Sequence, residues 1–229
     1  MSSAKPTASA GAKFSPAKPS GPLFALAFLC ALLGAVAAWA AGARPATLNQ
    51  ADKADVTRIE EYLNGLRTLQ SRFLQIASNG STAEGTLYIQ RPGRMRIEYD
   101  PPTPVLIVAD GLHLIYFDKE LEQVTHVGLD ASPAGILLQE KVALSGDLTI
   151  TKFERGPSVF RVTVVRGKDT NEGSLTLVFG DSPLSLRKWT VVDPQGVATE
   201  VALQNPQPGG TLKPELFKFS APAAKTTGK

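Results

Sequence analysis

The sequence contains almost no cysteine and almost no histidine, and both shortages restrict the chemistry it can perform. Among 229 residues there are one cysteine, Cys30, and two histidines, His113 and His126. Cys30 lies inside an apolar run near the start, so the chain beyond that run has no thiol for a disulfide, a metal site or a nucleophile. The two histidines stand in strand-like patterns on what we expect to be neighbouring strands, and we interpret them as ordinary strand residues.

Motifs for catalysis and for nucleotide binding are also missing. The sequence has no Gly-x-Ser-x-Gly elbow and no cluster of Cys and His with metal-ligand spacing. Ser185-Leu-Arg-Lys188 matches a Ser-x-x-Lys pattern, but it lies in a predicted strand and not at the start of a helix. Gly167-Lys168 lacks the earlier glycine of a phosphate-binding loop. The sequence therefore predicts a protein that is not an enzyme and that needs no cofactor or metal.

The chain beyond its first segment has no excess of positive charge. Of 24 basic and 21 acidic residues, residues 1–43 hold three lysines and no acid, which leaves 21 residues of each sign in the remainder. A balanced domain has no surplus cations to neutralise phosphates, so we predict no nucleic-acid partner.

Residues 1–43 have the pattern of a secretory signal peptide. Three lysines precede an apolar run that ends in the triplets Ala38-Trp-Ala40 and Ala41-Gly-Ala43, and we expect cleavage after Ala43 or Ala40. The alternative is an uncleaved anchor, because residues 23–43 are long enough to span a bilayer. Lipid attachment at Cys30 is disfavoured, because Leu29 stands where a small residue is needed. We expect residues 44–222 to form one domain and residues 223–229 a flexible tail.

The domain opens with one amphipathic helix, for which Asn49 or Thr47 is the predicted N-cap. Its apolar residues recur at three- and four-residue steps, with Tyr62 beside them. These residues are Val56, Ile59, Leu63, Leu66 and Leu69.

From Phe73 onward the pattern alternates with period two, and turn residues recur every eight to twelve positions. A second helix is predicted within 132–142, with Ser132 as its cap and Pro133 in its first turn. The predicted strands are 70–77, 83–90, 94–99, 105–109, 112–118, 121–127, 147–154, 158–166, 173–180, 184–193 and 197–204. We therefore predict a mainly β fold: an incomplete antiparallel β-barrel of about eleven strands with a helical lid over an apolar cavity.

The predicted strands have one apolar face. Met95, Ile97 and Tyr99 alternate with charged residues, and Phe160 and Leu177 lie in similar patterns further along. The pattern alone favours the simpler interpretation that these side chains fill a core beneath the helices.

Between residues 70 and 127 the sequence resembles the outer-membrane lipoprotein carrier family of LolA-like proteins. The matching features occur in order, behind a signal peptide and an amphipathic helix. They are Phe73-Leu-Gln75, Asn79-Gly80, Glu84-Gly-Thr-Leu87, Arg91-Pro-Gly-Arg-Met-Arg-Ile-Glu-Tyr99, Pro101-Pro102, Leu106-Ile-Val-Ala-Asp-Gly111 and Tyr116-Phe-Asp118, followed by Leu121-Glu-Gln123. The second half agrees in strand count and in its closing segment, residues 216–222.

The resemblance implies a periplasmic carrier that shelters the acyl chains of lipoproteins. It would take them from an inner-membrane ABC transporter and deliver them to an outer-membrane receptor, and we expect it to be a monomer. The implied lid-gating residues are Arg91, Leu63, Ile136 and Leu137. Met95 matches an apolar cavity residue of the family. The predicted acyl-chain cavity consists of Phe73, Leu87, Ile89, Met95, Ile97, Tyr99, Phe160 and Leu177.

Three other functions stay open at this point. A LolB-like outer-membrane receptor would be lipidated near its N-terminus, and a periplasmic module that senses lipoproteins would bind a transmembrane regulator. An esterase with an unrecognised triad is disfavoured by the missing elbow.

Overall fold

The computed structural model describes residues 44–167 and 173–220. The predicted signal peptide with Cys30 and the predicted tail at 223–229 lie outside these residues. The described residues contain the eleven predicted strands, and they fold as one antiparallel sheet with short helices. The predicted mainly β, incompletely closed fold is therefore confirmed.

The first helix, α1 (Gln50–Gly65), begins where its capping residue predicts. The Asp52 amide donates to Asn49 Oδ1 at 2.9 Å, and the Asn49 amide donates to Asp52 Oδ2 at 3.1 Å. This reciprocal capping box satisfies two amides that have no partner inside the helix. Ile59 and Leu63 are buried on its inner side, as the apolar spacing predicts.

The predicted helix is too long at its C-terminal end. Leu66 is the C-cap of α1, and Leu69 lies in the first strand, β1 (Thr68–Ala77). Both side chains still reach the core, because the chain turns at Leu66 and strand alternation brings Leu69 to the same face as Phe73. The three-residue spacing of apolar residues therefore continues from the end of the helix into the first strand.

The sheet consists of two meanders joined at their first and last strands. The strands after β1 are β2 (Thr82–Gln90), β3 (Arg94–Tyr99), β4 (Val105–Asp110), β5 (His113–Asp118), β6 (Gln123–Gly128), β7 (Leu148–Gly156), β8 (Val159–Arg166), β9 (Ser174–Asp181), β10 (Leu184–Val192) and β11 (Ala198–Pro208). Their order is β6-β5-β4-β3-β2-β1-β11-β10-β9-β8-β7. Because β1 pairs with β11 while β6 and β7 stay at opposite edges, the sheet is open.

The connection between the two edges carries the second helix. After β6 come η1 (Leu129–Ala131), α2 (Pro133–Leu138) and a loop at 139–147. Ser132 caps α2 as predicted, and its Oγ accepts from the Gly135 amide at 3.2 Å. The helix lies within the predicted stretch 132–142 and ends at Leu138, because the chain leaves helical geometry at Gln139. Gly135 allows α2 to pack on η1, since a Cβ there would lie 2.2 Å from the Leu129 carbonyl oxygen.

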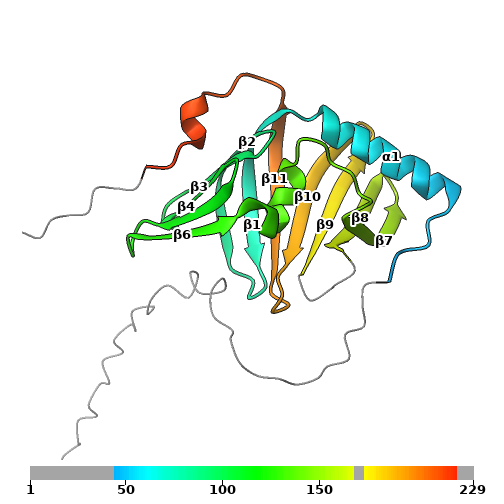
Figure 1. Ribbon diagram of the computed structural model, residues 1–229, viewed down its shortest axis with the longest axis horizontal. Helices are drawn as coiled ribbons and strands as arrows, with labels where there is room; N and C mark the ends of the chain where they lie inside the picture. Colours follow the sequence, from blue (N-terminus) through cyan, green and yellow to red (C-terminus); the bar gives the residue numbers. More distant parts are fainter. Residues whose placement is uncertain (1–43, 168–172, 221–229) are drawn as a thin grey trace, which may run out of the picture. The chain divides into compact units, whose positions relative to one another are not determined.

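Both helices pack on one face of the sheet, which we call the concave face. Figure 1 shows α1 running across the strands on the β10–β7 side, with α2 in front of the sheet. A single buried cluster joins Ile59 and Leu63 of α1 and Ile136 of α2 to residues of both meanders.

A smaller core lies on the opposite face of the sheet. Phe117 and Val108 are buried there, and the ring of Phe219 packs on Phe117 with centroids 5.6 Å apart. The segment that covers them includes η3 (Pro214–Phe217), whose Leu216 carbonyl accepts from Arg96 Nη1 at 3.1 Å. The C-terminal segment therefore supports the sheet from behind and leaves the concave face to the helices.

Candidate functional site

The sheet register brings the eight predicted cavity residues onto the concave face, in two groups. In the first meander, Leu87 pairs with Ile97 and Ile89 pairs with Met95. In the second, Phe160 of β8 pairs with Phe179, and Leu177 pairs with Val162. Strand alternation puts every second side chain of a strand on this face, so residues of one period-two row share it.

Phe73 and Tyr99 meet above Gly85, which pairs with both of them. Their rings are in an edge-to-face arrangement with centroids 5.2 Å apart. A Cβ at Gly85 would lie 2.7 Å from the Phe73 ring, so the glycine makes room for the aromatic pair. Burial raises the pKa of Tyr99, whose hydroxyl donates to Gln75 Oε1 at 2.6 Å. The polar end of Tyr99 is thus satisfied on an otherwise apolar face.

The concave face is filled in this structure. Seven of the eight predicted cavity residues are buried and Tyr99 is half-buried, because α1, α2 and their neighbours pack against them. The structure therefore has the interior that the pattern alone favoured, a core beneath the helices. In this structure the helices and their neighbours cover these side chains.

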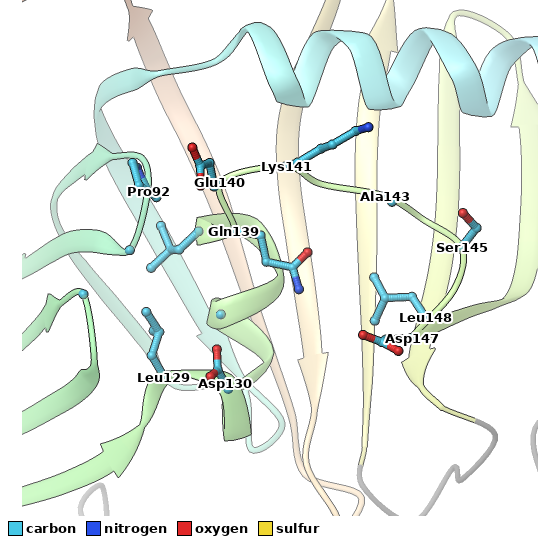
Figure 2. A pocket seen from close by; sticks show the side chains of 14 residues that line it. Pro92, Leu129, Asp130, Gln139, Glu140, Lys141, Ala143, Ser145, Asp147 and Leu148 are labelled. Carbon is cyan, nitrogen blue, oxygen red and sulfur yellow. The ribbon is translucent and has the colours of Figure 1, made fainter.

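Two pockets flank α2. The first, about 490 Å³, is surrounded by the β2–β3 turn at Pro92, by α2 and by the loop that follows α2. Figure 2 shows that Asp130, Glu140 and Asp147 line it. The second, about 460 Å³, lies between Ile136 of α2 and the adjoining ends of β8 and β9, at Val164 and Leu175. The first pocket is therefore lined by several charged groups, whereas the second has one charged residue, Arg166, among mainly apolar side chains.

Arg91 joins the C-terminal ends of both helices. Its Nε donates to the Gln139 carbonyl at 2.9 Å, and its Nη2 donates to the Gln139 and Glu140 carbonyls at 2.5 and 3.2 Å. Its Nη1 donates to the Leu63 carbonyl and, at 3.4 Å, to the Leu66 carbonyl. The contact with the lid that the resemblance implies is present, and Leu63 takes part through its backbone.

The Arg91 side chain is only 6% exposed, so it is not the exposed turn residue that its place before Pro92 would suggest. Burial lowers the pKa of its guanidinium, and the neighbouring Arg67 adds to this effect. The carbonyls at a helix C-terminus carry partial negative charge and attract a cation. The last turn of α1 has no basic residue of its own, so Arg91 supplies this charge from the end of β2.

Two further side chains, which the sequence reasoning missed, tie α1 to the loop after α2. Asn64 Nδ2 donates to the Val142 carbonyl, and Asn64 Oδ1 accepts from the Val142 amide, both at 2.9 Å. Glu60 Oε1 accepts from the Leu144 amide at 2.6 Å. The partners are backbone groups, so no pairing of side-chain types in the sequence indicates them.

Charged and polar groups also anchor α1 to the second meander. Asp55 forms an ion pair with Arg155 of β7, and Arg58 Nη2 lies 3.0 Å from Asp181 Oδ1 at the end of β9. Tyr62 accepts a hydrogen bond from the Leu186 amide at 3.1 Å and packs edge-on against Phe179. Helix α1 is thus bound to three strands of the second meander, independently of Arg91.

The predicted nearness of the two histidines is confirmed: the rings of His113 and His126 have centroids 6.0 Å apart. Within residues 44–167 and 173–220 no group of three or more His, Cys, Asp or Glu side chains is arranged to hold a metal ion. In the same part of the chain, no helix has both the length and the apolar character needed to cross a membrane.

An open antiparallel sheet whose apolar concave face is closed by two helices defines the class of lidded half-barrels. The sequence profile of the family described as outer membrane lipoprotein carrier protein LolA matches residues 64–220. The chain belongs to this family, and the family that the sequence features suggested is confirmed. Its function is therefore that of a lipoprotein carrier, a transport protein and not an enzyme.

Individual relatives agree with the family match. An outer-membrane lipoprotein carrier protein from Methylococcus capsulatus is 31% identical over 183 residues, which cover 76% of this chain and 88% of the relative. A protein of the same name from Pseudomonas aeruginosa is 31% identical over 196 residues, covering 82% of this chain and 92% of the relative. The similarity thus spans most of the length of both partners.

Proposed function

We propose that this protein carries lipoproteins across the periplasm with their acyl chains on the concave face, in the space that α2 and its loop fill in the closed structure. The observation that carries this proposal is the contact of one buried guanidinium with carbonyls at the ends of both helices. Arg91 holds a closed lid through hydrogen bonds alone, and such bonds can be exchanged when cargo arrives.

The energetics explain why a carrier is needed. Each methylene buried from water contributes about 0.8 kcal/mol, so two or three acyl chains cost on the order of tens of kcal/mol to expose. A free lipoprotein therefore stays in its membrane. A carrier has to replace the bilayer with an apolar surface of its own, and the concave face is the apolar surface that the helices cover.

The carrier also has to release its cargo. Opening the lid breaks the hydrogen bonds of Arg91 to Gln139 and Glu140, and hydrogen bonds to a charged group contribute about 1.5–3 kcal/mol each. The loaded, open carrier is destabilised by this amount relative to the closed one. Transfer to a receptor that pays no such cost runs downhill, and the lid closes behind the departing chains.

The route of the cargo rests on the family and on the first segment of the sequence. We place the mature protein in the periplasm after removal of residues 1–43, with cleavage after Ala43 or Ala40. The donor is an inner-membrane lipoprotein-releasing ABC transporter, which supplies the energy of extraction. The acceptor is an outer-membrane lipoprotein receptor, and the carrier acts as a monomer.

Native mass spectrometry tests the proposal. The protein, produced from the full chain, is mixed with a purified acylated lipoprotein and, separately, with the same lipoprotein lacking its acyl chains. A one-to-one complex with the acylated form alone is the expected result. Equal binding of both forms, or of neither, would overturn acyl-chain recognition.

The gating residues are tested by transfer to receptor-bearing vesicles. We expect Arg91→Leu to bind cargo but to release it more slowly than the wild type, because closing the empty lid no longer favours release. Met95→Asp is the matched cavity variant, since it adds a charge to the concave face, and we expect it to lose binding. If Arg91→Leu releases cargo as fast as the wild type, Arg91 is not the gate.

A further inference from the structure

Among the described residues, the pocket between α2 and the ends of β8 and β9 is lined mainly by apolar side chains, with Arg166 as its one charged residue. Its lining includes Ala131 at the end of η1, Pro133 at the start of α2, and Ile136 within the helix. On the other side lie Val164 near the end of β8 and Leu175 near the start of β9. Ile136, Val164 and Leu175 also belong to the buried cluster beneath the helices, so the floor of this pocket is the edge of the core itself.

A continuous apolar row leads inward from this floor. Along β9 the side chains of Leu175, Leu177 and Phe179 share the concave face, and β8 offers a paired row on the same face. Four residues of strand at about 3.4 Å each give the row a length of about 14 Å. It ends beneath α1, where Tyr62 packs on Phe179. The row contains Leu177 and runs beside Phe160, two of the predicted cavity residues.

We infer that the first acyl chain enters through this pocket, which we call the β8–β9 portal, and advances along the β9 row as α2 is displaced. The inference rests on the proposed function and adds to it the place of entry and the direction of loading. Loading therefore begins in the second meander and reaches the first meander only when α2 has moved.

The other pocket beside α2 does not suit an acyl chain. Asp130, Glu140, Lys141 and Asp147 line it, and bringing hydrocarbon against these groups would remove water from charged side chains. It also adjoins Gln139 and Glu140, whose carbonyls hold Arg91. We therefore assign this pocket to the latch side of α2 and the β8–β9 portal to the entry side.

The portal also explains how loading can start while Arg91 is still in place. Arg91 binds carbonyls that follow α2, whereas the portal lies at residues that precede and begin the helix. An acyl chain that enters at Leu175 contacts Ile136 first. Displacing Ile136 pushes α2 toward its C-terminal end, where Arg91 binds. Cargo thus pushes on α2 from the side opposite its latch.

The sequence permits a chemical block with a matched control. Cys30 is the only cysteine, and the only tryptophans are Trp39 and the buried Trp189. The test protein is the full chain with Cys30→Ala and Trp39→Phe. Ala131→Cys puts an exposed thiol on the rim of the portal, and Ser145→Cys puts one on the rim of the charged pocket. Each is modified with a polyethylene glycol maleimide after folding, so neither label interferes with folding.

Uptake is followed with a synthetic diacylglyceryl-cysteine lipopeptide whose acyl chains carry bromine, which quenches Trp189 on contact. We expect the label at residue 131 to slow quenching by roughly tenfold or more, and the label at residue 145 to leave the rate at that of the unlabelled proteins. Equal rates for both labelled proteins, or stronger slowing by the label at residue 145, would overturn the portal while leaving the proposed function intact. No binding of the lipopeptide by any unlabelled protein, checked by native mass spectrometry, would overturn the proposed function and the portal with it.

Discussion

The two helices that close the concave face are held in different ways. Helix α1 has 16 residues, a capping box and ion pairs to the second meander, so contacts outside the lid also hold it in place. Helix α2 has six residues, and Arg91 binds the two carbonyls that follow it. We therefore propose that α1 is a fixed wall of the site and that α2 with its loop is the part that moves.

The largest expected effects come from matched truncations in the two helices. Ile59 of α1 and Ile136 of α2 are both buried, and removing such a side chain costs about 2–5 kcal/mol in a rigid core. We expect Ile59→Ala to lower the free energy of unfolding by an amount in this range. Ile136→Ala should cost less, because a segment that opens locally cannot lose more than its own opening free energy. Urea denaturation measures both, and equal losses would remove the distinction between wall and lid.

Replacing Arg91 tests whether residues 139–144 open separately from α1. Arg91→Leu removes the donor to carbonyls at the ends of α1 and α2. We expect the opening free energy of residues 139–144 to fall by about 2 kcal/mol, which speeds their amide exchange by roughly thirtyfold. Exchange within α1 should change far less, because its ion pairs to β7 and β9 remain.

Arg91→Lys serves as the control for this replacement. It keeps the charge but loses the planar fork that reaches several carbonyls at once, so its exchange rates should lie between those of the wild type and Arg91→Leu. Uniform acceleration across α1 and residues 139–144 would show that Arg91 supports the whole fold and not the lid alone.

Asn64→Ala tests the hydrogen bonds between α1 and the loop after α2, and we expect a smaller effect. The variant loses both hydrogen bonds to the Val142 backbone. We expect a loss of about 1 kcal/mol, seen as roughly fivefold faster exchange at the Val142 amide. The matched variant Glu60→Gln keeps an acceptor for the Leu144 amide and should exchange as the wild type does. An unchanged Val142 rate in Asn64→Ala would mean that the loop is held by its apolar contacts.

Replacing either N-cap should have an effect similar in size to that of Asn64→Ala. Asn49→Ala and Ser132→Ala each remove a capping oxygen, at a cost of about 1 kcal/mol. In α1 the loss should appear as faster exchange in the first turn alone, whereas in α2 it should appear across the short helix. Hydrogen-exchange mass spectrometry separates the two patterns, and a confined effect in α2 would argue that the helix does not move as a unit.

Much of the fold could be predicted from the sequence because most strands carry an alternating apolar pattern and turn residues separate them. Asn49 and Ser132 indicated where the helices begin, since capping is a local property. The end of α1 was wrong, because Leu66 and Leu69 continue the apolar spacing after the helix has stopped. Local patterns thus located most boundaries and failed where an inward-facing strand follows directly.

Less of the site than of the fold could be predicted from the sequence. Periodicity put Met95 and Ile97 on one face, and the family resemblance singled out Arg91. No pattern could show that the partners of Arg91 and Asn64 are backbone carbonyls and amides, because every residue carries those groups. Nor could a pattern show that the helices leave an apolar pocket at Leu175 and a charged one at Asp130, since these depend on packing.

The fluorescence of Trp189 reports whether the acyl chains bind on the concave face. This side chain is buried on the concave face, where it pairs with Leu177 and Val201. In the full chain with Trp39→Phe, the lipopeptide with brominated acyl chains should quench the fluorescence of Trp189. The same peptide without acyl chains should leave that fluorescence unchanged. A stable complex with the acylated peptide in which Trp189 stays bright would contradict the account, because the chains would then be bound away from the concave face.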